Sequence, residues 1–311
     1  MTTEAVEDEL RGELRVELTR ALRRLPELAR GELTFMPLSG GITNRNFLVT
    51  GAPDGSKFVL RLAGNDTHLL GISREVEHAA TVAAAGVGVG PEVIAFVRPE
   101  GYLVTRFIEG RPIPEAEMRT PDRLRAVGDT LRRIHDGPAI PGLFVPFRIV
   151  EAYRALALSR GVRIPPEYDL AQAIARRIEL ACLTAPMELR PCHNDLLNAN
   201  FIDDGSRIRI VDWEYAGMGD RFFDLANFAV NHALDDHEEQ LLLEAYFGEV
   251  RDADAAHQRL MRFMSDFREA MWGVVQQGIS ELDFDFADYA RQHFERLERT
   301  AAQRQFRDAL A

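Results

Sequence analysis

The residues with the clearest chemical potential lie between Pro191 and Gly217, in the segment PCHNDLLNANFIDDGSRIRIVDWEYAG. The Asp-Gly pair at residues 204 and 205 separates two runs rich in β-branched and aromatic residues, a pattern that predicts an antiparallel hairpin. Asn200 precedes the first strand and Asp212 follows the second, so we expect their side chains to lie close together. An amide oxygen and a carboxylate suit Mg²⁺, which takes a few protein oxygens and leaves its other positions to water and phosphates.

Asp195 lies five residues before Asn200, on the loop that leads into this hairpin. That position suits a carboxylate that accepts a proton from a hydroxyl group rather than one that binds the metal. A His-x-Asp-x4-Asn run followed by an aspartate after a hairpin has the spacing of a kinase catalytic loop and its metal-binding aspartate. Asp203 and Asp204 are interpreted as turn residues. A metal-dependent hydrolase that uses His193 is a weaker alternative, because it would need a denser cluster of histidines and aspartates.

The composition bounds the classes of function. The chain has 311 residues, of which 46% are hydrophobic and 28% charged, as in ordinary globular proteins of one or two domains. Its net charge of -12 argues against a nucleic-acid or anionic-membrane partner, because both attract clustered lysine and arginine. The two cysteines are too few for a disulfide framework. Neither a signal peptide nor a membrane-spanning apolar run is recognisable, so we expect a cytoplasmic protein.

Short strands are predicted from residue 33 onward, after an amphipathic helical stretch at residues 4–30 to which no function is assigned. A glycine pair between two of these strands would let the backbone approach a ligand closely, and neighbouring hydroxyl and amide groups could donate to phosphate oxygens. The candidate phosphate-binding residues of this loop are Ser39, Gly40, Gly41, Thr43 and Asn44. Glycine-rich hairpin loops are often purely structural, so the loop alone does not establish a nucleotide site.

Arg61 is the one charged residue in an apolar strand, FVLRLAG, and a charge in that position needs a partner. The next segment, residues 73–86, begins with the capping residue Ser73 and ends at a glycine, which predicts a helix. A second hairpin is predicted at residues 92–108, followed by the linker EGRPIP. Beyond Thr120 helices dominate, and the apolar stripes of the last third are interpreted as core.

The motifs HNDLLNAN, IVDWEYAG and FFDLANF together resemble the choline/ethanolamine kinase branch of the aminoglycoside phosphotransferase-like kinases. The resemblance implies that ATP and Mg²⁺ are bound, with Asp195 as the catalytic base and with Asn200 and Asp212 as the metal ligands. It implies that the glycine-rich loop covers the nucleotide phosphates. It also implies that Asp224, in the last of these motifs, braces the catalytic loop.

The same resemblance assigns the remaining nucleotide contacts. Arg61 takes the place of the kinase strand lysine, and its rigid fork suits phosphate. Glu77 lies fourteen residues before Pro91, matches the family's helix glutamate and is expected to pair with Arg61, with Glu75 as the alternative. The backbone at the end of the second hairpin would meet the adenine, at Arg106, Phe107 and Ile108.

The acceptor side resembles a choline site only in part. Choline kinases hold a quaternary ammonium with aromatic faces and a nearby carboxylate, and Tyr215 and Trp272 match two of those aromatic residues. Val275 stands where the family has a second tryptophan, and Asn231 stands where it has an acidic residue. Each missing cation–π contact would weaken a choline site by about 0.5–2 kcal/mol.

The predicted fold class is α+β, a two-lobed protein-kinase-like fold with a small antiparallel sheet in the N-terminal lobe and a larger helical C-terminal lobe. The predicted domains are a nucleotide-binding lobe at residues 1–105, a hinge and linker at residues 106–114, and a catalytic and substrate lobe at residues 115–311. The predicted reaction is transfer of the ATP γ-phosphoryl group to a hydroxyl of a small molecule, with choline or ethanolamine as the first choice.

Two alternatives stay open at this point. Within the same fold, the acceptor could be an aminoglycoside, another sugar or thiamine, because a hydroxyl near an acidic cleft serves all of them. From another class, the chain could be a nucleotide-binding regulator without turnover. The intact set of Asp195, Asn200 and Asp212 argues against a regulator, because a protein that only binds nucleotide does not need a base.

Overall fold

The computed structural model describes residues 32–38, 44–64, 67–183 and 188–311, together with Gly12, Val16, Leu18, Thr19, Leu22 and Leu25. The chain divides into two compact units: Met1–Asn65 with Pro91–Ile108, and Asp66–Gly90 with Glu109–Ala311. The break after Ile108 falls within the predicted linker, whereas residues 66–90, which the sequence places in the first lobe, group with the second unit. Within the described ranges, no helix is long and apolar enough to cross a membrane.

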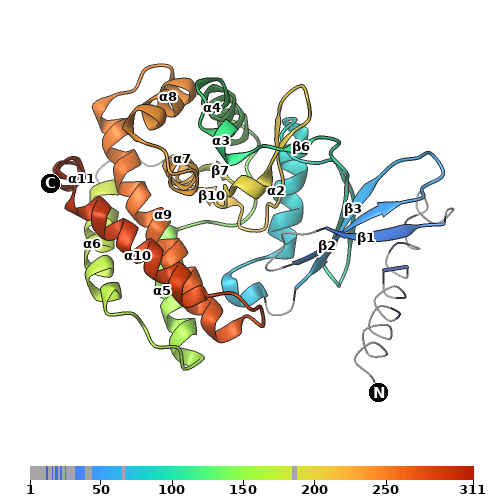
Figure 1. Cartoon of the computed structure of the whole chain (residues 1–311), viewed down its shortest axis with the longest axis horizontal. Helices are drawn as coiled ribbons and strands as arrows, with labels where there is room; N and C mark the ends of the chain where they lie inside the picture. Colours follow the sequence, from blue (N-terminus) through green and yellow to red (C-terminus); the bar gives the residue numbers. More distant parts are fainter. Residues whose placement is uncertain are drawn as a thin grey trace. The chain divides into compact units, whose positions relative to one another are not determined.

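The first unit is built on an antiparallel sheet with the strand order β1-β2-β3-β5-β4. Fully buried residues alternate with half-buried ones along β3, so one face of the sheet forms the core. Leu18 and Leu22 are buried in that core, which places this part of the predicted N-terminal helix against the sheet. The five strands follow the sequence prediction (Figure 1): β1 (Thr34–Leu38), β2 (Asn44–Thr50), β3 (Phe58–Ala63), β4 (Val93–Val97) and β5 (Tyr102–Arg106).

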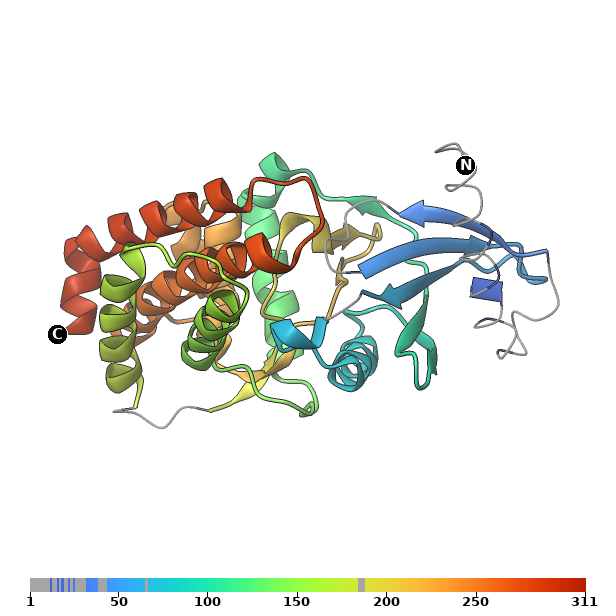
Figure 2. The ribbon, with the colours of Figure 1, turned by 90° about the horizontal axis from the view of Figure 1, so that it is seen from below.

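The second unit is mainly helical. Its long central helix α9 is buried on almost every side between Leu260 and Gln276, because α5, α7 and α10 pack around it. Figures 1 and 2 both show α10 running beside α9. The helices are η1 (Thr67–Leu70), α2 (Arg74–Gly86), α3 (Glu115–Met118), α4 (Pro121–His135), α5 (Pro146–Ser159), α6 (Glu167–Cys182), α7 (Arg221–Asn231), α8 (Asp236–Phe247), α9 (Asp252–Ile279), α10 (Phe286–Ala302) and α11 (Arg304–Leu310).

Short strands carry the polar motifs of the second unit. They form a two-stranded sheet, β10-β7, and a three-stranded sheet, β6-β8-β9. Both are antiparallel, and the β8–β9 hairpin is the one that the Asp-Gly signal in the sequence predicts. Their bounds are β6 (Arg111–Pro112), β7 (Arg190–Cys192), β8 (Phe201–Asp203), β9 (Ile208–Ile210) and β10 (Gly217–Gly219), with the short helix η2 (Asn198–Asn200) before β8.

Helix starts follow the predicted capping chemistry at some positions and depart from it at others. Ser73 caps α2 through its side chain, and Asp235 forms a capping box with Glu238 at the start of α8. Thr120 precedes α4 as expected, but its side chain does not cap that helix. Its hydroxyl donates instead to the carbonyl of Glu117, at 2.8 Å.

Gly128 on α4 is expected to be required for the packing of α4 against α8. A Cβ atom at this position would lie 2.8 Å from the Cβ of Ala245 and 3.2 Å from its carbonyl carbon, closer than side chains normally approach. Gly128→Ala should therefore lower the free energy of unfolding by about 1–3 kcal/mol, measured by denaturant titration. Gly86→Ala is the control, because a Cβ atom at residue 86 would meet nothing within 4 Å and alanine favours the helix. Equal losses in both variants would contradict the prediction.

Candidate active site

The hairpin of β8 and β9 brings Asn200 and Asp212 to the same end of a sheet. Phe201 pairs with Ile210 in the register, and the backbone N–H of Val211 donates to the carbonyl of Asn200 at 3.0 Å, which extends the pairing by one step. Asp212 follows directly with a φ of 69°, a left-handed conformation that aspartate and asparagine tolerate better than most residues. The expected proximity of the two positions is therefore present in the structure.

His193 holds the loop that carries Asp195. Its ring is fully buried, its Nε2–H donates to the carbonyl of Val211 at 3.0 Å, and its Nδ1 accepts from the backbone N–H of Asp195 at 3.2 Å. Both nitrogens are therefore engaged in joining the loop to the end of β9. This arrangement gives His193 a positioning role and leaves no lone pair for the hydrolase chemistry considered as an alternative.

The side-chain amide of Asn200 links the candidate metal ligands to the candidate base. Its Nδ2 donates to the backbone carbonyl of Asp195 at 2.9 Å, which leaves its oxygen as the atom that can coordinate a cation. Together with the carboxylate of Asp212, this makes a set of hard oxygen donors on a short, constrained segment. Such a set fits Mg²⁺, which prefers one or two protein oxygens and completes its shell with water and phosphate.

Asp224 braces the loop that carries Asp195, as the resemblance implies. Its two carboxylate oxygens accept the backbone N–H groups of His193 and Asn194 at 2.8 and 2.6 Å. The side chain is fully buried in the first turn of α7, where a carboxylate is favoured by the helix dipole. His135, at the end of α4, also donates to it through Nε2 at 3.0 Å.

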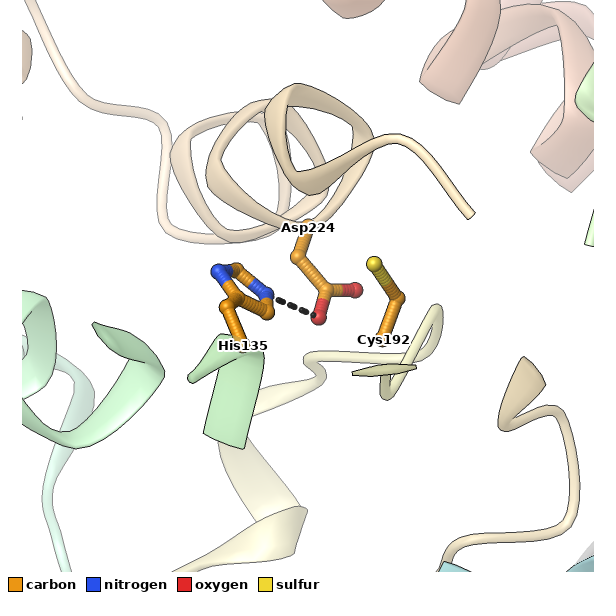
Figure 3. A group of neighbouring side chains, drawn as sticks. All are labelled: His135, Cys192 and Asp224. Carbon is orange, nitrogen blue, oxygen red and sulfur yellow. Dashed lines mark hydrogen bonds and ion pairs between the residues drawn. The ribbon is translucent and has the colours of Figure 1, made fainter. Parts of the chain in front are cut away.

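His135, Cys192 and Asp224 lie within ligand distance of one another, yet their chemistry is that of a brace (Figure 3). The Nδ1 atom of His135 accepts from the hydroxyl of Tyr246 at 2.7 Å, so both of its nitrogens are engaged. Burial and the nearby Asp224 raise the pKa of the Cys192 thiol well above its usual value, so it stays protonated and is a poor metal ligand. The cluster therefore supports the loop rather than a metal ion.

Asp224→Asn is expected to destabilise the fold and the site together. An amide presents an NH₂ group where loop N–H donors need an acceptor, and each unsatisfied buried donor costs about 1–3 kcal/mol. The free energy of unfolding should therefore fall by roughly 2–4 kcal/mol, measured by denaturant titration. Asp122→Asn, at a side chain that is 96% exposed, is the matched control and should change stability little. A wild-type free energy of unfolding for Asp224→Asn would show that the brace is dispensable.

The carboxyl group of Asp195 sits among charges. Its pKa is raised to about 8, chiefly by burial; Arg268 acts in the opposite direction, and Glu269, Asp212 and Glu214 also contribute to the increase. A carboxylate with a raised pKa is a stronger base, which suits a group that takes a proton from an alcohol.

Arg268 and Glu269 on α9 belong to this site, although the sequence analysis interpreted their helix as core. The Nη1 group of Arg268 lies 3.4 Å from Oδ1 of Asp195 and 2.5 Å from Oε1 of Glu269. Its guanidinium lies 4.4 Å from the ring centroid of Tyr215. The signal in the sequence was an Arg-Glu pair inside the apolar run FMSDFREAMWGVV, because buried charges are rare unless they have partners.

Glu77, expected to pair with Arg61, binds Arg74 of its own helix α2. Arg74 Nη1 lies 2.7 Å from Glu77 Oε2 and 3.2 Å from Glu214 Oε2, so it ties α2 to the segment that follows Asp212. Glu77 is buried, whereas Glu75, the alternative, is exposed. The pairing of Arg61, a half-buried residue of β3, with Glu77 stays a prediction.

The other expected nucleotide contacts are only partly described. Asn44 is buried at the start of β2, and the remaining residues of the glycine-rich loop lie outside the described residues: Ser39, Gly40, Gly41 and Thr43. In the expected adenine-binding segment, the N–H of Arg106 donates to the carbonyl of Glu92 and the N–H of Phe107 to that of Lys57. Both N–H groups therefore already have partners within the sheet. The backbone groups that remain as predicted adenine contacts are the carbonyls of Arg106 and Phe107 and the backbone of Ile108.

Of the three expected acceptor residues, two lie together. Trp272 Nε1 donates to the hydroxyl of Tyr215 at 3.1 Å, and the indole is 7% exposed. Asn231, the last residue of α7, donates instead to the side chain of Asn227 at 3.2 Å. Asn227 also accepts from the N–H of Leu196, next to the candidate base, at 2.6 Å. These hydrogen bonds connect Asn231 to the loop rather than to the aromatic pair.

Comparisons with known proteins give the relatives of this chain. Residues 34–263 match the phosphotransferase enzyme family. The human choline/ethanolamine kinase is 25% identical over an alignment of 317 positions, gaps included, that spans 85% of this chain and 79% of that protein. A choline/ethanolamine kinase family protein from Mesorhizobium loti has a TM-score of 0.81 at 30% identity, covering 95% of this chain and 97% of the other. The choline kinase LicA from Streptococcus pneumoniae has a TM-score of 0.77 at 22% identity, covering 93% and 99%.

The fold and the relatives together define a small-molecule kinase with the protein-kinase-like architecture. The chain belongs to the phosphotransferase enzyme family, and its similarity extends to the choline/ethanolamine kinases. The predicted fold class and the predicted family are therefore confirmed.

Proposed function

We propose that the protein transfers the γ-phosphoryl group of ATP to a hydroxyl group of a small molecule. The observation that supports this most directly is the convergence of a base and two oxygen donors. Asn200 donates to the backbone of Asp195, and the hairpin places Asp212 one residue beyond the partner of Asn200. Phosphoryl transfer needs little covalent chemistry from the protein, so a base and ligands held in fixed positions are the main requirements.

In this reaction Asp195 accepts the proton of the acceptor hydroxyl. The hydroxyl oxygen forms the new bond to the γ-phosphorus, and the bond from that phosphorus to the β–γ bridging oxygen breaks. ADP leaves with the electron pair of the broken bond, and the proton stays on Asp195 until solvent removes it. Arg268, beside the carboxylate, favours its ionised form before the proton arrives.

Asn200 and Asp212 would hold Mg²⁺ through their side-chain oxygens. When bound, the ion neutralises charge on the β- and γ-phosphates. The hydrogen bond from Asn200 Nδ2 to Asp195 fixes which amide atom is available to the ion. The same bond keeps the base and the ligand in one relative position.

We assign nucleotide binding to the first unit and to α2. The phosphates would be covered by the glycine-rich loop and contacted by Arg61, which Glu77 would orient. Arg61 suits this role because a guanidinium presents paired donors to phosphate oxygens. The proposed loop residues are Ser39, Gly40, Gly41, Thr43 and Asn44.

The acceptor that the family relationship favours is an amino alcohol of the choline or ethanolamine type. The pair of Tyr215 and Trp272 supports this choice, because an alkylammonium group binds well to aromatic rings. Aminoglycosides, other sugars and thiamine are the competing acceptors within the same fold. Two residues weaken the match to a choline site: Val275, where the family has a second tryptophan, and Asn231, where it has an acidic residue.

An acceptor screen tests the proposed function. Purified protein with ATP and Mg²⁺ should release ADP in the presence of an amino alcohol, and the phosphorylated acceptor should be detectable by mass spectrometry. Asp195→Ala supplies the background rate. ATP-dependent stabilisation of the fold without turnover on amino alcohols, sugars or thiamine would instead favour a nucleotide-binding regulator.

A further inference from the structure

Arg268 has two buried donors that face no acceptor in the described part of the chain. Its side chain is 1% exposed, and its Nη1 group serves Asp195 and Glu269. Its Nε and Nη2 groups have no hydrogen-bond partner among the residues that the structure describes. Buried charged donors without acceptors are costly, so these two groups point to a ligand that supplies the acceptor atoms.

The two donors form one edge of the guanidinium. Nε and Nη2 lie side by side in a plane, at the spacing of the two oxygens of a carboxylate. The chain uses this same edge elsewhere for that purpose. Arg119 binds Glu238 through Nε and Nη2 at 3.0 and 2.8 Å, and Arg251 binds Asp254 through the same atoms at 2.8 and 2.6 Å. The edge of Arg268 is therefore suited to a carboxylate.

Within the described ranges, the carboxylates that contact Arg268 contact its Nη1 group and not the Nε–Nη2 edge. Glu269 meets the Nη1 group and accepts the hydroxyl of Tyr289 at 2.8 Å through its other oxygen. Asp195 also meets the Nη1 group, at 3.4 Å, and its side chain is 13% exposed. The Nε–Nη2 edge belongs to the same guanidinium whose Nη1 group meets Asp195, so a ligand group bound at that edge would lie only a few bonds from a hydroxyl at Asp195.

We propose that the phosphoryl acceptor is an amino alcohol that also carries a carboxylate, and that Arg268 binds this carboxylate through its Nε–Nη2 edge. This inference rests on the proposed transfer to an amino alcohol. The amine is left to the aromatic pair of Tyr215 and Trp272. Choline and ethanolamine lack the carboxylate, and a site built around a polar group discriminates strongly against analogues that lack it.

Matched acceptors test the inference in the wild-type protein. L-Serine is ethanolamine with a carboxylate, and carnitine is a choline-like quaternary amine with a carboxylate. ADP release with MgATP gives kcat/KM for each of the four compounds. In at least one pair, the carboxylated compound should be turned over with kcat/KM at least about tenfold higher than its partner, the effect expected of one charge-assisted hydrogen bond.

Arg268→Gln tests whether Arg268 is the source of that preference. The ratio of the two kcat/KM values within a pair should fall to about one or below, and this ratio is independent of any general loss of activity. Arg262→Gln is the control on the same helix, because Arg262 binds Glu239 at 2.5 Å and should leave the ratio unchanged. If Arg268→Gln keeps the wild-type ratio of kcat/KM values, the inference is overturned. That is the result expected if the Nε–Nη2 edge binds only water. If Arg268→Gln does not fold, the wild-type comparison alone decides.

The outcomes separate this inference from the proposed function. If the carboxylated compound exceeds its partner by less than about tenfold in kcat/KM in both pairs, the carboxylate assignment is overturned and phosphoryl transfer to an alcohol is left intact. ADP release that no acceptor of either kind stimulates would overturn the proposed transfer to an amino alcohol, and the inference with it.

Discussion

Asp195→Ala is expected to reduce turnover by at least about 10²- to 10⁴-fold, the usual contribution of a positioned general base, while MgATP still binds. The loop does not depend on the Asp195 side chain for its shape. His193 and Asn200 hold it through the backbone of Asp195, and Asp224 holds it through the two preceding N–H groups. Loss of the carboxylate should therefore remove the base and leave the fold. ADP release measures turnover, and calorimetry measures nucleotide binding.

The pH dependence of the wild-type enzyme provides a second readout of the same group. Burial raises the pKa of Asp195 to about 8 in the free protein, and only the ionised form can accept a proton. Because kcat/KM reports the free enzyme, it should fall as the pH is lowered through this pKa. Asp122→Asn should keep the wild-type profile, since that side chain is 96% exposed. Unchanged turnover in Asp195→Ala would remove Asp195 from the mechanism.

Local patterns in the sequence account for the parts of the site that were predicted. The Asp-Gly turn and its flanking β-branched residues are sufficient to predict a hairpin that brings Asn200 close to Asp212, because the register of a hairpin depends on residues that are neighbours in the sequence. In the structure Asn200 is hydrogen-bonded to Val211, the residue before Asp212. Ser73 and the glycine at the end of its segment likewise define α2. The N–H groups of Arg106 and Phe107 show the limit of this approach, since a sequence does not say which backbone donors a sheet already uses.

Arg268 could not be placed from the sequence because it lies 73 residues from Asp195 and meets it only through packing of α9. A further feature hid it. A helix buried on almost every side has no polar stripe, so helical periodicity does not separate a site residue from core. The partner of Glu77, in contrast to that of Asp195, could have been predicted from the sequence. Arg74 lies three residues before Glu77 on the same face of the helix, a spacing at which opposite charges pair.

Asp212→Asn is expected to lower turnover by at least about 100-fold at millimolar Mg²⁺, since a metal ion contributes several kcal/mol of charge stabilisation to phosphoryl transfer. Asparagine keeps the oxygen but loses the charge, and it tolerates the φ of 69° at this position. The backbone should thus stay in place, which separates the charge effect from strain. Magnesium titrations of ADP release should require a higher Mg²⁺ concentration for half-maximal rate, and chelation should stop turnover in the wild type.

The same substitution should also shift the pH profile, and this distinguishes a ligand near the base from a distant structural residue. The negative charge of Asp212 helps to raise the pKa of Asp195, so its removal lowers that pKa and moves the acid limb of kcat/KM to lower pH. Asp308→Asn, at a side chain that is 68% exposed, should change neither the Mg²⁺ requirement nor the acid limb. An Asp212→Asn enzyme with the wild-type Mg²⁺ requirement would exclude Asp212 as a metal ligand, and an unmoved acid limb would show that the two carboxylates are not electrostatically coupled.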